Sequence, residues 1–316
     1  MNMKQYLLVA LLVVQVLIVV AIWLLGLQGP KVPEPFLEFD MGTVDRLSIA
    51  SSDESISLTR VDDVWELPDG NPADERKINR VLERLADASG DWPVATSEST
   101  AKRFEVTKDG FQKHISVFAD DETLADIYVG TSPSFRLVHA RAVNGGPVHA
   151  IEFANHDAST TPNSWLDKSL LRPQGSISSL ERVDSYVLSK NEGVWSVADE
   201  TELDQSEVRD YIERFETLSV FELSESDVTE TEPSAQIVIT DDDGSFTLTL
   251  YYVESSEDWV VHSDREVSHY GLATYIGSEL VKDLEDLVPE DEEEAESSSE
   301  DGDAVMTVED ITDESE

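Results

Sequence analysis

The feature that most constrains the fold is an internal repeat. The stretch DVWELPDGNPADERKINRVLERL at residues 63–85 has the same layout as GVWSVADETELDQSEVRDYIERF at residues 193–215. In each, a short apolar segment with a tryptophan is followed by a turn and an amphipathic segment. Trp65 and Trp195 lie 130 positions apart, and so do Asp74 and Asp204. Self-similarity at one spacing predicts copies of a single supersecondary unit.

The first copy reads as a hairpin followed by a helix. Residues 55–60 alternate apolar and polar side chains, and residues 64–67 form a second short apolar segment, which is the pattern of two paired strands. The turn DGNPAD follows, with Asp74 as the expected N-cap. The next apolar residues fall on one helical face: Ile78, Val81, Leu82 and Leu85. The helix is expected to cover the hairpin.

The second copy matches in kind. Its strands lie on either side of the turn KNEG at residues 190–193, and Asp204 with Glu207 forms an expected capping box. The apolar stripe that follows consists of Val208, Tyr211, Ile212, Phe215 and Leu218. The second copy therefore predicts the same hairpin and covering helix as the first.

Each copy continues as an antiparallel meander. The expected strands are residues 114–119, 124–130, 135–143 and 147–153 in the first copy, and 234–240, 245–253 and 258–264 in the second. The turns NGG and DDDGS supply residues that tolerate positive φ. Each copy closes with a short amphipathic piece, at residues 164–171 and 281–288, and Trp165 lies in the first of these.

These patterns predict an α+β fold class. We expect an N-terminal transmembrane helix and two tandem repeats of a hairpin–helix–antiparallel-meander module, at residues 38–171 and 172–288. The residues that mark the repeat are Trp65, Asp74, Trp195, Asp204 and Trp165.

The N-terminal stretch predicts the membrane helix. Residues 7–27 are apolar except for Gln15, and at about 1.5 Å per residue they span the roughly 30 Å hydrocarbon layer. The alternative is a cleaved signal peptide, whose apolar region is shorter and ends at a small-x-small site that LLGLQGPKV does not offer. Lys4 in residues 1–6 places the N-terminus in the cytoplasm. Residues 28–37 are then a proline-marked linker, and the rest of the chain lies outside the membrane.

The charge excludes one class of partner. The chain holds 67 Asp and Glu against 22 Lys and Arg, for a net charge of −45, which repels nucleic-acid phosphates. Residues 289–316 contain fourteen acidic residues and no basic one, so we expect a disordered acidic tail. The acidic excess outside the tail is compatible with a saline habitat. The chain has no cysteine, which excludes disulfides, thiolate metal sites and a cysteine nucleophile.

No motif predicts a catalytic, cofactor or metal site. Ser99–Lys102 fits S-x-x-K, but the SDN and KTG partners of penicillin-recognising enzymes do not follow. Nucleophile-elbow, phosphate-loop and H-E-x-x-H motifs are absent from the sequence. TDDDGS is too short for an EF-hand loop and reads as a hairpin turn. Acidic pairs are so abundant that none stands out.

The histidines and tryptophans have structural interpretations. His139 with His149 resembles His262 with His269, and strand alternation predicts that all four lie on strand surfaces rather than around a metal ion. Trp65 and Trp195 are expected in the core, opposite the helix stripes; a ligand groove is the other interpretation.

A family resemblance adds context. The order of SLTR, the tryptophan strand, LPDGNPAD, an amphipathic helix and the later WLDKSLL resembles the DUF4340 family of uncharacterised bacterial envelope proteins, over residues 45–290. The second copy departs from it, with SVADETELD in place of ELPDGNPAD. The resemblance implies a tether to the bacterial inner membrane and, for many members, genes beside ABC-type export systems of the gliding-motility kind. It implies no site residues.

The expected function is therefore non-catalytic. We expect a single-pass inner-membrane protein with a periplasmic domain that acts by contact, as an accessory or scaffold of an ABC-type permease or another envelope protein, with no cofactor and no nucleic acid. The alternative is an envelope hydrolase or carbohydrate-binding enzyme that uses a carboxylate pair between the two modules. A ligand sensor is a third interpretation, but residues 1–6 leave little room for a cytoplasmic output.

Overall fold

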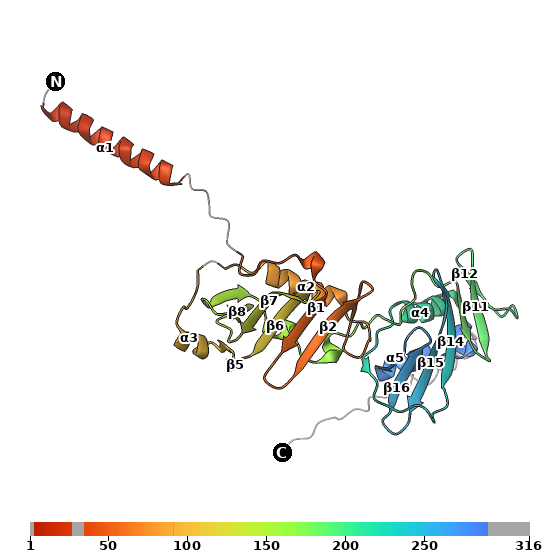
Figure 1. The fold of residues 1–316 in the computed structure, drawn as a ribbon. Coiled ribbons are helices and arrows are strands. Elements are labelled where there is room, and N and C mark those ends of the chain that lie inside the picture. Colours follow the sequence, from red (N-terminus) through yellow and green to blue (C-terminus); the bar gives the residue numbers. More distant parts are fainter. Residues whose placement is uncertain (1–2, 27–34, 91, 290–316) are drawn as a thin grey trace, which may run out of the picture. The chain divides into compact units, whose positions relative to one another are not determined.

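The fold is described from a computed structural model that covers residues 3–26, 35–90 and 92–289 (Figure 1). Residues 1–2 of the expected cytoplasmic segment, most of the expected linker at 28–37 and residues 290–316 of the expected tail lie outside the described residues. The described chain is an α+β protein built mainly from antiparallel strands with few helices.

The chain forms two compact units. The first comprises residues up to 68 together with residues 75–165, and the second comprises residues 69–74 together with those from 166 onward. The sequence predicted a boundary between residues 171 and 172. The contacts divide the chain six residues earlier and group the turn 69–74 with the second unit.

The first unit contains a seven-stranded antiparallel sheet in the order β3-β2-β1-β6-β7-β8-β9. The strands are β1 (Arg46–Ala50), β2 (Ser55–Val61), β3 (Val64–Glu66), β6 (Lys113–Ala119), β7 (Glu122–Val129), β8 (Leu137–Ala142) and β9 (His149–Glu152). The helical elements are η1 (Met41–Thr43), α2 (Glu75–Ala86), α3 (Glu98–Arg103), η2 (Asn155–Asp157) and η3 (Pro162–Ser164). A two-stranded sheet pairs β4 (Val106–Thr107) with β5 (Gly110–Phe111).

The second unit contains an eight-stranded antiparallel sheet in the order β12-β11-β10-β14-β15-β16-β17-β13. The strands are β10 (Ser179–Arg182), β11 (Tyr186–Asn191), β12 (Val194–Ser196), β13 (Glu222–Leu223), β14 (Ala235–Asp241), β15 (Gly244–Val253), β16 (Asp258–Ser263) and β17 (His269–Leu272). The helical elements are α4 (Gln205–Glu216), α5 (Thr274–Leu280) and η4 (Leu284–Leu287).

The two sheets correspond strand for strand over their shared part. β3 and β12 begin 130 residues apart, and so do the twelve-residue helices α2 and α4. The turn between the hairpin strands is also shared, because its two residues have positive φ in both units: Asp62 and Asp63 in the first, Glu192 and Gly193 in the second. Two consecutive positive φ values match the right-handed twist of a tight hairpin.

Burial of the helix stripe builds each core. In α2 the buried residues are Ile78, Val81, Leu82 and Leu85, and in α4 they are Val208, Tyr211, Ile212 and Phe215, as the spacing predicted. Matching rows of strand residues are buried too: Leu58, Leu47 and Val117 pair across one sheet, and Leu188, Leu180 and Ile239 across the other. Each fully buried aliphatic side chain contributes roughly 1.5–3 kcal/mol.

The start of α4 confirms half of the predicted capping box. The Asp204 carboxylate accepts hydrogen bonds from the backbone N–H groups of Ser206 and Glu207. The other half of the prediction is wrong, because the Asp204 N–H donates to the Leu287 carbonyl at 2.9 Å. Glu207 instead accepts from Lys282 at 3.3 Å. Leu287 in η4 and Lys282 before it therefore bond to the Asp204 N–H and the Glu207 carboxylate, which a capping box would pair with each other.

Gln205, the first residue of α4, secures the adjacent edge strand. Its side-chain oxygen accepts from the Trp195 N–H and its side-chain nitrogen donates to the Trp195 carbonyl, both at 2.9 Å. The amide therefore satisfies the backbone groups that an edge strand would otherwise expose.

Several elements were not anticipated from sequence. β1, β10, β13 and β17 are four short strands, of two to five residues, and the segment from α3 to β5 precedes the first meander. The amphipathic pieces predicted at 164–171 and 281–288 carry short 3₁₀ turns. η3 ends at the first residue of the former, and η4 lies in the middle of the latter.

The N-terminal residues form α1 (Met3–Gly26). Among the residues that the structure describes, none of the helices has the length and apolar character that crossing a membrane requires. The structure therefore gives no support to the predicted transmembrane helix.

Gly277 in α5 gives a test of the second unit's packing. A methyl group at this position would lie 2.5 Å from the Trp259 Cβ, which is held by its strand and cannot move aside. Glycine to alanine inside a helix normally stabilises by up to about 1 kcal/mol, whereas overpacking costs about 1–3 kcal/mol. We therefore predict that Gly277→Ala lowers the free energy of unfolding, measured by urea titration.

The matched control is Ser278→Ala, at the next and exposed position of the same helix. That variant should leave the free energy of unfolding nearly unchanged. A Gly277→Ala protein as stable as the wild type would contradict the packing of α5 on Trp259.

Candidate functional site

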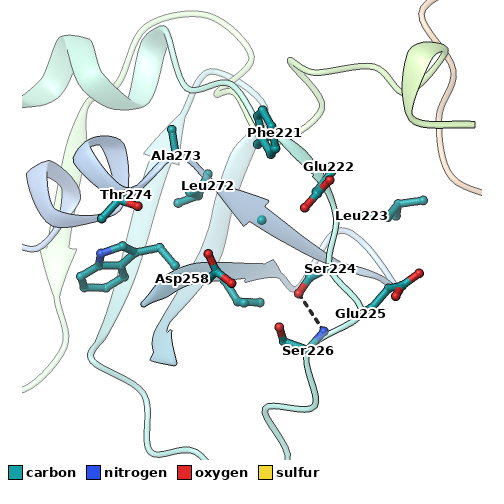
Figure 2. A pocket seen from close by; sticks show the side chains of 13 residues that line it. Phe221, Glu222, Leu223, Ser224, Glu225, Ser226, Asp258, Leu272, Ala273 and Thr274 are labelled. Atoms are coloured by element: carbon teal, nitrogen blue, oxygen red, sulfur yellow. Dashed lines mark hydrogen bonds between the residues drawn. The ribbon is translucent and has the colours of Figure 1, made fainter. Parts of the chain in front are cut away.

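A hollow in the second unit lies at the β13 edge of its sheet. It has a volume of about 660 Å³ and is lined by residues 221–226, 258–260 and 271–274 (Figure 2). We call it the β13 hollow. Its residues come from the segment after α4, from β16 and from the end of β17 with the start of α5.

Backbone hydrogen bonds hold the segment after α4 in place. The Phe221 N–H donates to the Gly271 carbonyl at 2.7 Å, and the Ser224 N–H donates to the His269 carbonyl at 2.9 Å. Between these bonds, Glu222 and Leu223 pair with β17. The Ser224 hydroxyl then accepts from the Ser226 N–H at 3.2 Å, which turns the chain away from the sheet (Figure 2).

The β13 hollow has an apolar floor and an acidic rim. Val260, Leu272 and Trp259 are buried along its floor. Phe221 stands beside it with 61% of its surface exposed. The rim carries the carboxylates of Glu222, Glu225 and Asp258 (Figure 2), and among the described residues no lysine or arginine lines the hollow.

This composition determines what the hollow can hold. The carboxylates repel anions and favour cationic groups, while the buried floor and Phe221 favour apolar side chains. Among the described side chains that line the hollow, there is no set of hydrogen-bond donors arranged to stabilise a negative charge that forms during a reaction. The arrangement therefore suits a segment that carries both basic and apolar residues.

A serine, a histidine and an aspartate meet on the outer face of the first sheet. Asp126 Oδ1 lies 2.6 Å from His114 Nε2 and accepts from the Ser116 hydroxyl at 2.8 Å. The same histidine nitrogen is 3.4 Å from the serine oxygen. In a nucleophile relay the imidazole stands between the two, using a different nitrogen for each. Here the serine donates directly to the carboxylate, so the cluster is a cross-strand polar network and lacks relay geometry.

The surface prediction is wrong for two histidines. His139 and His149 are each only 7% exposed. The Phe104 ring stacks on His139 at a centroid distance of 3.8 Å, and burial lowers the pKa of His139. Phe36 packs against His149 at 5.1 Å. Strand alternation did not reveal this burial because Phe36 and Phe104 come from segments outside the meander.

The second histidine pair is partly exposed. His262 and His269 are directly opposite each other on β16 and β17, and their rings stack at 4.7 Å. Burial and the neighbouring His262 lower the pKa of His269. Among the described residues, no group of three or more His, Asp or Glu side chains is placed to hold a metal ion.

The residues that mark the repeat lie in the core or directly before a helix. Trp65, Trp165 and Trp195 are buried, with exposures of 2%, 0% and 6%. The Trp165 indole donates to the Ser159 carbonyl at 2.9 Å. Asp74 directly precedes α2, and Asp204 caps α4. None of the five lines the β13 hollow.

The hollow's own residues were missed from sequence. Phe221 and Glu222 follow an amphipathic helix without any motif, and Asp258 begins a predicted strand. Phe221 lies between Val220 and Glu222, and this local sequence carries no signal that distinguishes an exposed phenylalanine from a buried one.

Tyr270 forms a buried polar contact in the second unit. Its hydroxyl donates to the Asn71 side-chain oxygen at 2.8 Å, and both residues are buried. Burial raises the pKa of Tyr270, and the charges of Glu266 and Asp69 raise it further. Burial also raises the pKa of Glu266, and a hydrogen bond with Tyr270 offsets part of that rise.

Comparison with known proteins gives a family match. A family model described as "Domain of unknown function (DUF4340)" matches residues 65–236, which is more than half of the 316 residues. The match begins at Trp65, within β3, and ends within β14, so it includes α2 and the whole of the second hairpin with α4 but not β2. No significant match was found among curated proteins or solved structures.

The raised pKa of Glu266 predicts a pH effect on stability. The folded protein binds the Glu266 proton more tightly than the unfolded chain, whose glutamate has the ordinary value of 4.5. The stabilising contribution is therefore present below about that pH and is lost as the pH rises through the folded-state value. We predict that Glu266→Gln raises the free energy of unfolding at pH 7 relative to the wild type and gives less gain at pH 4.

Urea unfolding at the two pH values measures this difference. Glu254→Gln, which changes an exposed carboxylate in the same unit, corrects for the general effect of removing one negative charge. A Glu266→Gln variant whose gain is no larger at pH 7 than at pH 4 would refute the assignment.

Proposed function

We propose that this chain, which belongs to the DUF4340 family, is a membrane-anchored extracytoplasmic protein that acts by contact, as an accessory or scaffold of an ABC-type envelope transport system. The link to a transport system rests on the family resemblance alone, which is an association and not a mechanism. The observation that carries the contact role is the β13 hollow with its exposed phenylalanine and acidic rim.

The N-terminal sequence, rather than the described helix α1, supports the anchor. Residues 7–27 are apolar except for Gln15, and a helix of these 21 residues would be about 31 Å long at 1.5 Å per residue. The large apolar side chains described between Leu11 and Ile22 are 43–64% exposed. A continuous apolar surface of this kind is unfavourable in water and is covered by lipid in an anchor. We propose the bacterial inner membrane as the site, with the N-terminus in the cytoplasm.

The correspondence of the two sheets supports a duplicated module. The shared 130-residue offset covers the hairpin turn, the edge strand and the covering helix, which are packed in the same order in both units. We propose that the two units are copies of one hairpin–helix–meander module. Their outer segments then differ by insertion: α3 to β5 in the first unit, and β13 with its following loop in the second.

The β13 hollow supports a partner of stated chemistry. Phe221 offers the kind of exposed aromatic anchor that dominates binding energy at interfaces, next to a buried apolar floor. The three carboxylates around it select basic side chains by charge complementarity. We propose that the partner presents a basic and partly apolar segment on the extracytoplasmic side of the membrane.

The membrane orientation is tested by proteolysis from outside. All lysines and arginines except Lys4 follow the apolar stretch. Trypsin added to intact spheroplasts should therefore remove a C-terminal epitope, while a cytoplasmic marker protein stays intact. An epitope that survives in spheroplasts and is lost only after lysis would contradict the orientation.

The contact site is tested by photo-crosslinking in cells. We predict that a photoreactive phenylalanine analogue at Phe221 forms an adduct with an envelope membrane protein. The same analogue at Val194 should form none or much less, because Val194 is similarly exposed, at 57%, but lies on β12 at the opposite edge of the same sheet.

A charge variant extends this experiment. Glu222→Lys with Asp258→Lys should weaken the adduct at position 221, since the rim would repel a basic segment. Equal adducts at positions 221 and 194, or no adduct at 221, would contradict a docking role for the β13 hollow.

A further inference from the structure

A second hollow lies in the first unit and has the opposite electrostatic character. It has a volume of about 630 Å³ and is lined by Arg84, Ser132 and residues 134–136 and 153–157. We call it the Arg136 hollow. Its residues come from the loop between β7 and β8, from the last turn of α2 and from the segment that follows β9.

The loop between β7 and β8 exposes the side chains of Phe135 and Arg136, and its backbone has an unusual conformation at Arg136. The Leu137 N–H donates to the Ser134 carbonyl at 3.2 Å and closes a tight turn whose central residues are Phe135 and Arg136. Arg136 has a φ of +57°. Among the described residues, ten non-glycine positions have positive φ, and eight of these are Asp or Glu. A left-handed conformation is costly for a long side chain, and such positions concentrate at functional sites.

The rest of the structure holds this turn in place. The Arg136 carbonyl accepts from the Phe153 N–H at 3.0 Å, and Phe153 is 1% exposed. This hydrogen bond therefore fixes the turn to Phe153, the buried residue that directly follows β9. Phe135 itself is 85% exposed, so its ring is not needed for the core.

The charges of the Arg136 hollow differ from those of the whole chain. Its lining has two arginines and one aspartate, whereas the chain has three times as many acidic as basic residues. Asp157 is paired with Arg84. Arg136 has no acidic partner within 4.0 Å among the described residues, and its guanidinium lies 5.1 Å from the Phe135 ring centroid. With screening over about 8 Å at physiological salt, these nearby charges outweigh the distant acidic surface.

The side chains that line the Arg136 hollow favour one class of ligand. An unpaired guanidinium is a bidentate donor for a carboxylate. An exposed aromatic ring beside it accepts the apolar face of a flat ligand, and the serine hydroxyls of residues 132 and 134 offer further hydrogen bonds. Nucleic acid is disfavoured by the net charge of −45 over the whole molecule.

We propose that the Arg136 hollow binds a carboxylate-bearing sugar, with the carboxylate on Arg136 and the sugar ring on Phe135. Acidic sugars fit the volume and supply both an anion and a ring with an apolar face. This proposal is independent of the docking role of the β13 hollow, because the two hollows lie in different units.

The test uses the full-length protein in a detergent without a sugar headgroup. Ligand-observed saturation-transfer NMR would be recorded with sodium glucuronate, glucose and sodium acetate as probes. We expect glucuronate to bind at least about tenfold more tightly than glucose or acetate, because only it makes both contacts. Arg136→Gln should weaken glucuronate binding about tenfold, and Phe135→Ala about fivefold.

The matched control is Arg103→Gln. Arg103 is exposed and stacks on the neighbouring Phe104 ring at 5.0 Å, but it does not line the hollow. This variant should bind glucuronate as the wild type does, and Phe135→Tyr should restore most of the binding lost in Phe135→Ala. Three outcomes would overturn the proposal: no saturation transfer to glucuronate, equal binding in Arg136→Gln and wild type, or displacement of glucuronate by acetate at equal concentration.

Discussion

The packing of an amphipathic helix on a tryptophan-bearing hairpin underlies both units. In each, a twelve-residue helix buries four large apolar side chains over a sheet whose strands carry a matching buried row. At roughly 1.5–3 kcal/mol for each buried side chain, the helix stripe outweighs any single polar contact in the unit. The tight turn with two positive φ values sets the hairpin register, and the register decides which face meets the helix.

The edges of the sheets are where the units diverge. The tryptophan edge of the second sheet is secured by Gln205, whose amide satisfies the Trp195 backbone. The opposite edge strand is the short β13, which lines the β13 hollow. In the first unit the segment between α2 and β6 forms α3, β4 and β5, and Phe104, between α3 and β4, stacks on His139. The two sheets thus have the same strand order over their shared part, while the segments at their edges differ and form different surfaces.

Local sequence patterns correctly predicted the elements that form through contacts between residues close together in the sequence. The stripes at Ile78 and Val208, the capping carboxylate of Asp204 and the hairpin at residues 62–63 follow from spacing and turn chemistry that act over a few residues. The partner of the Asp204 N–H could not be predicted, because Leu287 is 83 residues away in sequence. Burial of His139 depends on Phe104, and exposure of Phe135 depends on a turn fixed by Phe153; both are tertiary effects without a local signal.

Charge is distributed unevenly over this architecture. Asp and Glu occupy eight of the ten left-handed non-glycine positions among the described residues and also the rim of the β13 hollow, so part of the acidic excess lies at turns and at this sheet edge. The Arg136 hollow is an exception, with an unpaired guanidinium beside an exposed ring. We propose that these two hollows, which differ in charge and lie in different units, bind a basic segment and an acidic sugar at separate sites.

Hydrogen–deuterium exchange of the full-length protein, followed by mass spectrometry of its peptides, tests the central claim most directly. The hairpins at residues 55–66 and 186–196 and the helices α2 and α4 should all exchange slowly, because each helix is buried against its own hairpin. The loop at residues 224–234 should exchange fast by comparison. If one hairpin and its helix were as fast as that loop while the other pair stayed protected, the two units would not share one mode of packing.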